Sequence, residues 1–366
     1  MENKIKAEII SHSKRRNTGE EIITYKLTFP RIILSEVNTY KMMEKNTSSS
    51  RAIPFEKMVE VVEKEPFIPI AWQLSHKGMQ GTKYITDEKV IEFKEMRWLN
   101  ARNAAVESAK KLVEDDITIK KLLNTNHSNE LSKNYGNRLI EPFMWTTQLI
   151  TGTRESFEHL FEQRCPIYNV ENLKFTSKRD AIKLYPHLKD MTDLEWLQCN
   201  SGQAEIHFMD LAEKMYDALN KSKPTYYINY LSEFYDNFWH IPFEEEIKEK
   251  FGRDISTEDL IKMSVCLTAK VSYTKIGDEN SITIEKAREM YEKLKDAGHW
   301  SCFGHIAKCM TDEERDTWIK GRVVEDSCEN GYFFEAPEET KGFCKNLRGF
   351  ISLRQYIEDN IDLKDI

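Results

Sequence analysis

A run of short hydroxyl side chains that ends in an arginine is the stretch of this sequence best suited to chemistry. It reads Asn46-Thr47-Ser48-Ser49-Ser50-Arg51-Ala52-Ile53-Pro54. Serine hydroxyls are short hydrogen-bond donors and a guanidinium is a planar, permanently charged fork, so together they suit a phosphate monoester. The same string also fits an ordinary polar loop, because short motifs often occur by chance. The rest of the chain has to separate these two interpretations.

A second set of reactive residue types lies near the C-terminus. His299, Cys302, His305 and Cys309 follow the spacing H-x2-C-x2-H-x3-C, and such side chains bind zinc. Structural zinc sites usually draw their ligands from two well-separated pairs, which this spacing does not provide. A metal-binding or regulatory module is therefore kept as an alternative, and no metal ligand is assigned.

The composition limits the class of protein. The chain has 366 residues, of which 40% are hydrophobic, and we expect one large domain over residues 1–366. Its formal charge of −8 argues against binding of a nucleic-acid polymer by the whole surface. No run approaches about 18 apolar residues, so we expect no membrane span. Seven cysteines without a CxxC pair and an N-terminus unlike a secretory signal predict a cytoplasmic protein with reduced thiols.

Hydrophobic periodicity predicts the elements that must position these residues. Alternation of apolar and polar side chains predicts two strands, at residues 4–12 and 21–29, that pair as a hairpin. Helical spacing predicts helices within 31–43, 55–64, 87–114, 203–219, 260–273, 283–297 and 347–357. We expect buried helix over 139–164, an inserted excursion over 166–200, and a strand with a loop at 331–339. Together, these predicted elements indicate an α+β fold in which helices dominate.

Eight segments follow one another in an order that resembles one known family. They are residues 30–54, 137–143, 157–165, 203–206, 239–242, 264–273, 298–305 and 346–354. In this order they resemble the motifs of the flavin-dependent thymidylate synthases (ThyX), in the long form found in phages and some bacteria. That form carries THRxxSRNASSSRAIP, then ANRLLEPF, FFxLRC and AQPEI, and later SVARxARVSY and SGHWSPFEH. Single pieces are weak, but eight in sequence are hard to explain by chance.

The resemblance implies a fold and an activity. The fold would be ThyX-like, helix-rich with a mixed or antiparallel sheet, and its segment order is rearranged relative to the short form. The activity would be methylation of dUMP at C5 to dTMP, a methyltransferase reaction with bound FAD. NADPH would be the reductant and methylenetetrahydrofolate the one-carbon donor. Family members are homotetramers whose active sites combine several subunits, and a phage-encoded member would work in the host-cell cytoplasm.

The resemblance also assigns roles to individual residues. Ser49 and Arg51 match residues that hold dUMP, and Arg138 matches an arginine that reaches the phosphate from a neighbouring subunit. Arg164 matches an arginine that meets the pyrimidine, so Arg164 and Ser49 are the catalytic candidates. Two further nucleotide contacts are expected at Glu36 and Ser50. The cofactor-binding candidates are Thr39, Tyr40, Lys41, Asn46, His159, Gln163, Gln203 and His305.

This chain departs from the family pattern at specific positions. Tyr40 replaces a histidine, Lys41 an arginine and Glu44 a serine, and Gly304 stands where the PFEH motif has glutamate. Lysine keeps the charge of arginine but loses its bidentate fork. The nucleotide contacts are intact, whereas groups around the flavin and folate differ. Alternatives to dUMP methylation are therefore dCMP methylation, dUMP hydroxymethylation, and a non-catalytic homologue that binds a deoxypyrimidine monophosphate.

Overall fold

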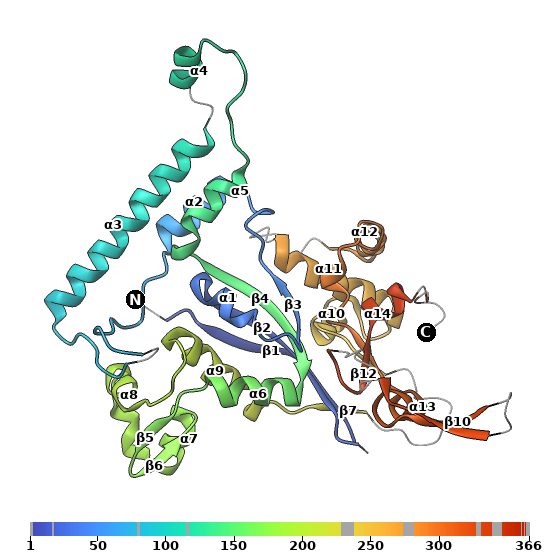
Figure 1. Cartoon of the computed structure of the whole chain (residues 1–366). Helices are drawn as coiled ribbons and strands as arrows, with labels where there is room; N and C mark the ends of the chain where they lie inside the picture. Colours follow the sequence, from blue (N-terminus) through green and yellow to red (C-terminus); the bar gives the residue numbers. More distant parts are fainter. Residues whose placement is uncertain are drawn as a thin grey trace.

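A five-stranded sheet forms the centre of the computed structural model, which describes residues 3–16, 18–78, 81–114, 117–227, 238–273, 282–326, 331–338, 346–359, 361 and 363 (Figure 1). The strand order is β3-β4-β2-β1-β7. These strands are β1 (Lys6–Arg15), β2 (Glu21–Pro30), β3 (Glu44–Thr47), β4 (Trp145–Thr153) and β7 (Thr225–Tyr227). Only the β1–β7 pair is parallel, so the sheet is mixed and the fold is α+β.

One face of this sheet is covered by α6 (Arg154–Arg164) and α9 (Ile206–Lys221). Alternate residues of β2, among them Tyr25 and Leu27, form a buried cluster with Phe157 and Phe208 of these helices. Because neighbouring residues of a strand point to opposite faces, Thr24 and Leu149 lie on the other face. We call the face with Tyr25 the α6 face and the opposite one the α11 face.

The α11 face is covered by the C-terminal part of the chain. Its helices are α10 (Glu244–Phe251), α11 (Thr257–Tyr273), α12 (Ile284–Asp296) and α14 (Leu353–Glu358). A small antiparallel sheet of β12 (Phe350–Ser352), β9 (Ala307–Cys309) and β8 (Trp239–His240) lies with them. Leu149 of the central sheet joins the same buried cluster as Val265 and Phe303. Two parts of the chain far apart in sequence therefore enclose one core.

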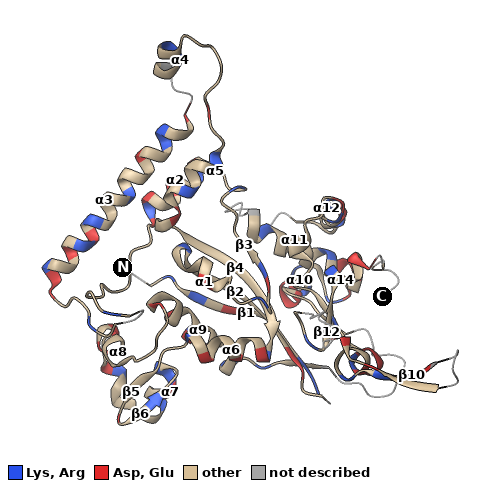
Figure 2. Cartoon of the chain, viewed as in Figure 1, with Lys and Arg blue, Asp and Glu red and all other residues tan. Residues whose placement is uncertain are grey.

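Three helices form a separate layer beside the edge of the sheet. They are α2 (Phe55–Lys64), α3 (Glu88–Val113) and α5 (Lys133–Ile140), and Phe55, Val106 and Ile140 share a buried cluster. Gly136 permits the close contact of α5, since a Cβ there would lie 2.7 Å from the Phe55 ring. Helix α3 runs outward towards α4 (Ile117–Leu123), and acidic and basic residues alternate along it (Figure 2).

The remaining elements are short. The 166–200 segment contains β5 (Tyr168–Val170), β6 (Leu173–Phe175), α7 (Lys178–Leu184) and α8 (Asp193–Cys199), and it has a buried cluster of its own around Trp196. Helix α1 (Leu34–Val37) follows η1 (Arg31–Ile33). The others are η2 (Glu141–Phe143), η3 (Pro186–Asp190), η5 (Trp300–Cys302), α13 (Asp312–Arg315), η6 (Asp316–Lys320), and the hairpin β10 (Arg322–Asp326) and β11 (Gly331–Glu335). None of the helices in the described ranges is long and apolar enough to cross a bilayer.

The structure confirms most predicted elements and corrects some. The N-terminal hairpin and helices α2, α3, α9, α11 and α12 are present, and Gly298 ends α12 with φ of 67°. The prediction of buried helix over 139–164 is wrong in its middle, where β4 runs through the centre of the sheet. The predicted helix within 31–43 ends at Val37, and 347–357 contains β12 before α14. Residue 339, in the strand and loop expected at 331–339, lies outside the described residues.

Candidate active site

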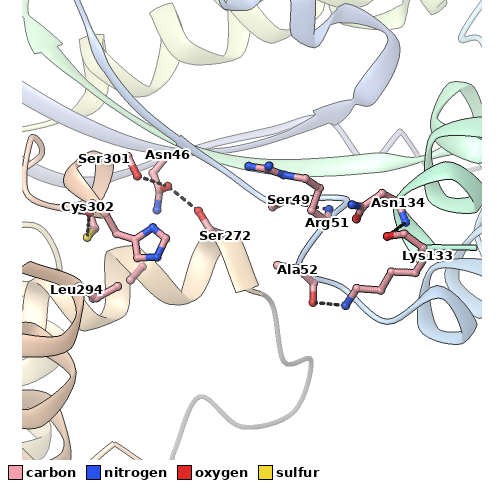
Figure 3. Close-up of a pocket in the computed structure, with 13 residues that line it drawn as sticks. Asn46, Ser49, Arg51, Ala52, Lys133, Asn134, Ser272, Leu294, Ser301 and Cys302 are labelled. Atoms are coloured by element: carbon pink, nitrogen blue, oxygen red, sulfur yellow. Dashed lines mark hydrogen bonds between the residues drawn. The ribbon is translucent and has the colours of Figure 1, made fainter. Parts of the chain in front are cut away.

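The serine–arginine motif lies in a pocket of about 500 Å³, called here the Ser49 pocket (Figure 3). Four segments of the chain line it. They are the motif itself, the start of α5 with its N-cap Ser132, helix α11, and the end of α12 with the residues that follow it before β9. The lining residues are Asn46, Ser49, Arg51, Ala52, Ser132, Lys133, Asn134, Ala269, Ser272, Leu294, His299, Ser301 and Cys302.

Backbone hydrogen bonds hold the motif in place after β3 ends. The amide of Ser49 donates to the carbonyl of Ser272 at 3.0 Å, which fixes the motif against α11. The Ser49 hydroxyl in turn accepts from the amide of Arg51 at 3.3 Å. On the other side, the side-chain amide of Asn137 donates to the carbonyl of Ser50 at 2.6 Å. The loop is thus anchored on both sides, and the Arg51 side chain remains exposed.

The charge of the Ser49 pocket is positive. Arg51 and Lys133 line it, and the described lining residues include no Asp or Glu. Lys133 also donates to the carbonyl of Ala52 at 3.3 Å, so both cations belong to one side of the pocket. Two cations with serine hydroxyls and no carboxylate suit an anionic ligand such as a phosphate monoester. Lys133 was not among the predicted site residues, although it lies shortly before the matched segment at residues 137–143.

A second pocket, of about 560 Å³, contains another predicted arginine. Arg138 lines it together with Arg31, Ser35 and Glu141, and Arg31 forms an ion pair with Glu141 at 3.1 Å. Glu36, a predicted nucleotide contact, is half-buried in the adjoining α1. Arg138 and Arg51 therefore line different pockets of the same chain.

Several predicted cofactor residues meet on the α6 face, away from the Ser49 pocket. The Tyr40 hydroxyl donates to Gln163 at 3.1 Å, and Gln163 contacts His159 at 3.1 Å. The Arg164 guanidinium lies 5.8 Å from the Tyr40 ring centre and 5.4 Å from that of Phe208. Its Nε is buried and has no hydrogen-bond partner among the described residues. We call these residues the Tyr40 cluster.

A lysine that the sequence did not single out belongs to this cluster. Lys45 alternates with Glu44 and Asn46 along β3, so its side chain lies on the α6 face, where it donates to the carbonyl of Tyr40. Burial, followed by repulsion from Lys41, lowers the pKa of Lys45 to about 8. Burial also raises the pKa of Tyr40. The strand alternation was the signal that could have identified Lys45.

His305, another predicted cofactor residue, is fully buried on the α11 face. Its Nδ1 contacts the Thr151 hydroxyl at 2.8 Å, and Thr151 contacts Thr24 at 2.6 Å. Thr24 contacts Nε2 of His240 at 2.8 Å, which completes a chain of four buried polar side chains. Burial lowers the pKa of His305 to about 3, and burial with nearby His12 and His305 lowers that of His240 to about 3.

Two other predicted residues, Thr39 and Gln203, make local contacts with the backbone. The Thr39 hydroxyl donates to the carbonyl of Glu36 at 2.6 Å, and the Gln203 side chain donates to that of Ser201 at 3.2 Å. Asn46 lines the Ser49 pocket, whereas the buried side chain of Ser50 does not. In a single chain, most of the predicted residues are thus divided among the Ser49 pocket, the second pocket with Arg138, and the Tyr40 cluster.

The alternative of a zinc site has no support in the geometry. Among the described residues, no three His, Cys, Asp or Glu side chains are grouped so as to hold a metal ion. Cys302 donates to the carbonyl of His299 at 3.1 Å, while His305 contacts Thr151. The five cysteines in the described ranges are free thiols, and Cys328 and Cys344 lie outside those ranges.

Comparison with known proteins gives a distant structural likeness only. No family model matches the sequence, and no curated protein matches it. Among solved structures, the chain is similar to two of a UMP/dUMP methylase, PolB from Streptomyces cacaoi, bound with 5-Br UMP and with 5-Br dUMP. In both cases the sequence identity is 12%, the TM-score is 0.37 and the match covers 60% of this chain. It covers 90% of the methylase chain in the 5-Br UMP complex and 91% in the 5-Br dUMP complex. A likeness at this level carries no argument about function.

Proposed function

We propose that the Ser49 pocket binds the phosphate of a deoxypyrimidine monophosphate and that the protein modifies C5 of its base. The observation that carries this proposal is the lining of the pocket. Ser49, Arg51 and Lys133 meet there without an acidic side chain among the described lining residues. Three of the segments that resemble motifs of one nucleotide-methylating family, residues 30–54, 264–273 and 298–305, contribute to this one pocket. Methylation of dUMP to dTMP is the reaction that the resemblance favours.

FAD is the cofactor that we propose for this reaction, with NADPH and methylenetetrahydrofolate as co-substrates. The Tyr40 cluster fits an anionic cofactor, because it combines Lys41, Lys45 and Arg164 and leaves the buried Nε of Arg164 without a partner among the described residues. Tyr40, His159 and Gln163 would hold the cofactor beside these cations. Bound flavin supplies the redox chemistry of one-carbon transfer, for which no protein side chain is suited.

The chain's own residues would bind and polarise the nucleotide. Ser49 and Arg51 would hold the phosphate, since a guanidinium and hydroxyls match its oxygens. In an active site shared between copies, the Arg164 guanidinium, fixed against Tyr40 and Phe208, would stabilise negative charge that develops on the pyrimidine. Holding the base in one orientation contributes to rate by proximity alone.

We further propose that the active site combines residues of more than one subunit, as a homotetramer would allow. The supporting observation is the division of the predicted residues among three places in one chain, with Arg51 and Arg138 in different pockets. An exposed Arg138 is available to a neighbouring copy. In a symmetric oligomer such residues of different copies complete each other's sites.

The experiment that tests the function is product analysis with both nucleotides. The protein is incubated with dUMP or dCMP, FAD, NADPH and methylenetetrahydrofolate labelled in its one-carbon unit, and the products are identified by mass spectrometry. Labelled dTMP from dUMP supports the main proposal. A labelled methyl-dCMP or hydroxymethyl-dUMP would support the alternative suggested by Tyr40, Lys41 and Glu44. Nucleotide binding without any labelled product would mean that the protein binds nucleotides but does not modify them.

Arg51→Ala and Arg51→Lys provide matched controls for this experiment. Loss of the guanidinium should abolish product formation, and lysine should restore part of it because it keeps the charge. Unchanged product formation by the alanine variant would show that the Ser49 pocket is not the substrate site.

A further inference from the structure

The Ser49 pocket has two chemically different ends. Figure 3 shows Ser49, Arg51 and Lys133 on one side and Asn46, Ser272 and Ser301 on the other. The first side carries cationic donors. Asn46, Ser272 and Ser301 on the second side are neutral, and the direction of their hydrogen bonds decides what they offer to a ligand.

The orientation of Asn46 is fixed by its partners. Its side chain is 3% exposed, and its Nδ2 donates to the backbone carbonyl of Thr268. A carbonyl oxygen only accepts, so the amide nitrogen must face Thr268 and the amide oxygen must face the pocket. That oxygen lies 2.6 Å from the Ser272 hydroxyl and 3.3 Å from the Ser301 hydroxyl.

Both serine protons are therefore committed to Asn46. A serine hydroxyl has one proton to donate, and the Asn46 oxygen only accepts. What Ser272 and Ser301 present to the pocket is then their lone pairs. Lone pairs repel phosphate oxygens and favour a ligand N–H group. Arg51 and Lys133, at the opposite end, have no lone pairs to offer and favour the phosphate.

From this polarity we infer that Ser272 and Ser301 accept a hydrogen bond from an N–H group of the nucleotide base, while the phosphate lies at the Arg51 end. The inference rests on the proposed function and names the residues that read the base in that same pocket. A uracil base would supply its ring N3–H, and a cytosine base its exocyclic amino group. In either case the two serines contribute to base specificity by accepting a hydrogen bond from the base. Asn46 is the positioning residue, because it sets the orientation of both hydroxyl groups.

The test compares nucleotides that have the N–H group with nucleotides that lack it. Binding of dUMP, N3-methyl-dUMP, dCMP, N4,N4-dimethyl-dCMP and deoxyribose 5-phosphate is measured by calorimetry. Wild-type protein should bind one methylated analogue about tenfold less tightly than its parent, the loss expected for one hydrogen bond with an acceptor left unpaired. The pair that shows this loss identifies the base.

Ser301→Ala and Ser301→Thr form the matched pair of variants. Alanine should reduce the discrimination between parent and methylated analogue, since only Ser272 then accepts, and leave the affinity for deoxyribose 5-phosphate unchanged, whereas threonine, which keeps the hydroxyl, should retain the discrimination. If the nucleotides bind but neither methylation nor Ser301→Ala changes their affinity, the inference is overturned and the proposed function stands. If wild-type protein binds neither dUMP nor dCMP, the proposed function and this inference both fail.

Discussion

The carboxylate of Glu44 occupies the space that a side chain at residue 304 would need. A Cβ placed on Gly304 would lie 2.8 Å from Cδ and 3.0 Å from Cγ of Glu44. The Asn346 side chain donates to the same carboxylate at 2.7 Å and holds it there. In the resembling family, residue 44 is serine and residue 304 is glutamate. We therefore propose that the two departures compensate each other, with β3 supplying the carboxylate that position 304 lacks.

This exchange predicts a coupling between the two positions. Gly304→Ala should displace the Glu44 carboxylate from Asn346 and cost about 1–2 kcal/mol of unfolding free energy, the range of a lost hydrogen bond with local crowding. In a Glu44→Ser background the same change should cost close to nothing. Urea unfolding of the two single variants and the double variant gives the coupling energy.

Gly331→Ala is the control for this cycle, because a Cβ at Gly331 meets nothing within 4 Å among the described residues. It should change stability by a few tenths of a kcal/mol. Equal costs of Gly304→Ala with and without Glu44 would show that the two positions are independent.

The sequence predicted most elements that have a clear hydrophobic period and missed the central strand β4. β4 reads Trp-Thr-Thr-Gln-Leu-Ile-Thr-Gly-Thr and lies between two strands with both faces covered, so it shows no polar face. Its repeated threonines favour a strand and were the usable signal. Pairing of β3 with β4, which brings Glu44 opposite Thr151, cannot be read from either segment alone.

The sequence identified segments that contribute to the candidate site, but it did not identify the side-chain contacts between them. The motif around Ser49 and Arg51 was recognisable by residue type, and these two side chains do line one pocket. Ser272 and Ser301 were missed because single serines in a helix and in a loop carry no pattern. Their importance arises from Asn46, more than 220 residues away in the chain, which directs both hydroxyls.

The buried histidines predict a loss of stability in mild acid. The pKa of His240 and that of His305 fall to about 3, below the usual value near 6.5. As the pH falls from 6.5 towards 3, the unfolded chain binds protons that the folded chain cannot. Stability is therefore complete above pH 6.5 and declines below it, by about 1.4 kcal/mol per pH unit for each histidine.

His240→Gln should reduce this dependence of unfolding free energy on pH by the contribution of one histidine, about 1.4 kcal/mol per pH unit. The measurement is urea unfolding at several pH values between 5 and 7, a window above the range in which most carboxylates titrate. His127, which is exposed, provides the control, and His127→Gln should leave the slope unchanged. An unaltered slope in the His240 variant would mean that this ring is protonated in the folded protein.

A shared active site predicts complementation between two inactive variants. Arg51→Ala removes a cation from the Ser49 pocket and Arg138→Ala removes one from the other pocket, so each variant alone should be inactive. If sites combine Arg51 of one copy with Arg138 of another, random co-assembly of the two should restore about a quarter of wild-type activity. Co-expression with two different tags and assay of the doubly tagged species provide the measurement.

Arg51→Ala combined with Ser49→Ala is the matched control. Both residues line the same pocket of the same chain, so co-assembly cannot produce an intact pocket. Recovery of activity in this control, or its absence in the Arg51–Arg138 pair, would contradict a site shared in this way.

Lys45 predicts a link between flavin binding and alkaline stability. Its pKa of about 8 lies below the usual value near 10.5, so the folded protein loses this proton at a lower pH than the unfolded chain. Stability of the cofactor-free protein should therefore rise from pH 8 towards 10.5, by about 0.5–1 kcal/mol per pH unit once solvent screening of this half-buried group is allowed for. Lys45→Met should remove that rise, whereas Lys41→Met, at an exposed position, removes the repulsion but not the burial and should retain most of it. An anionic cofactor bound at the Tyr40 cluster would stabilise the charged lysine and flatten the wild-type curve. Unfolding at pH 8, 9 and 10 with and without FAD measures both effects, and a curve that FAD leaves unchanged would place the cofactor elsewhere.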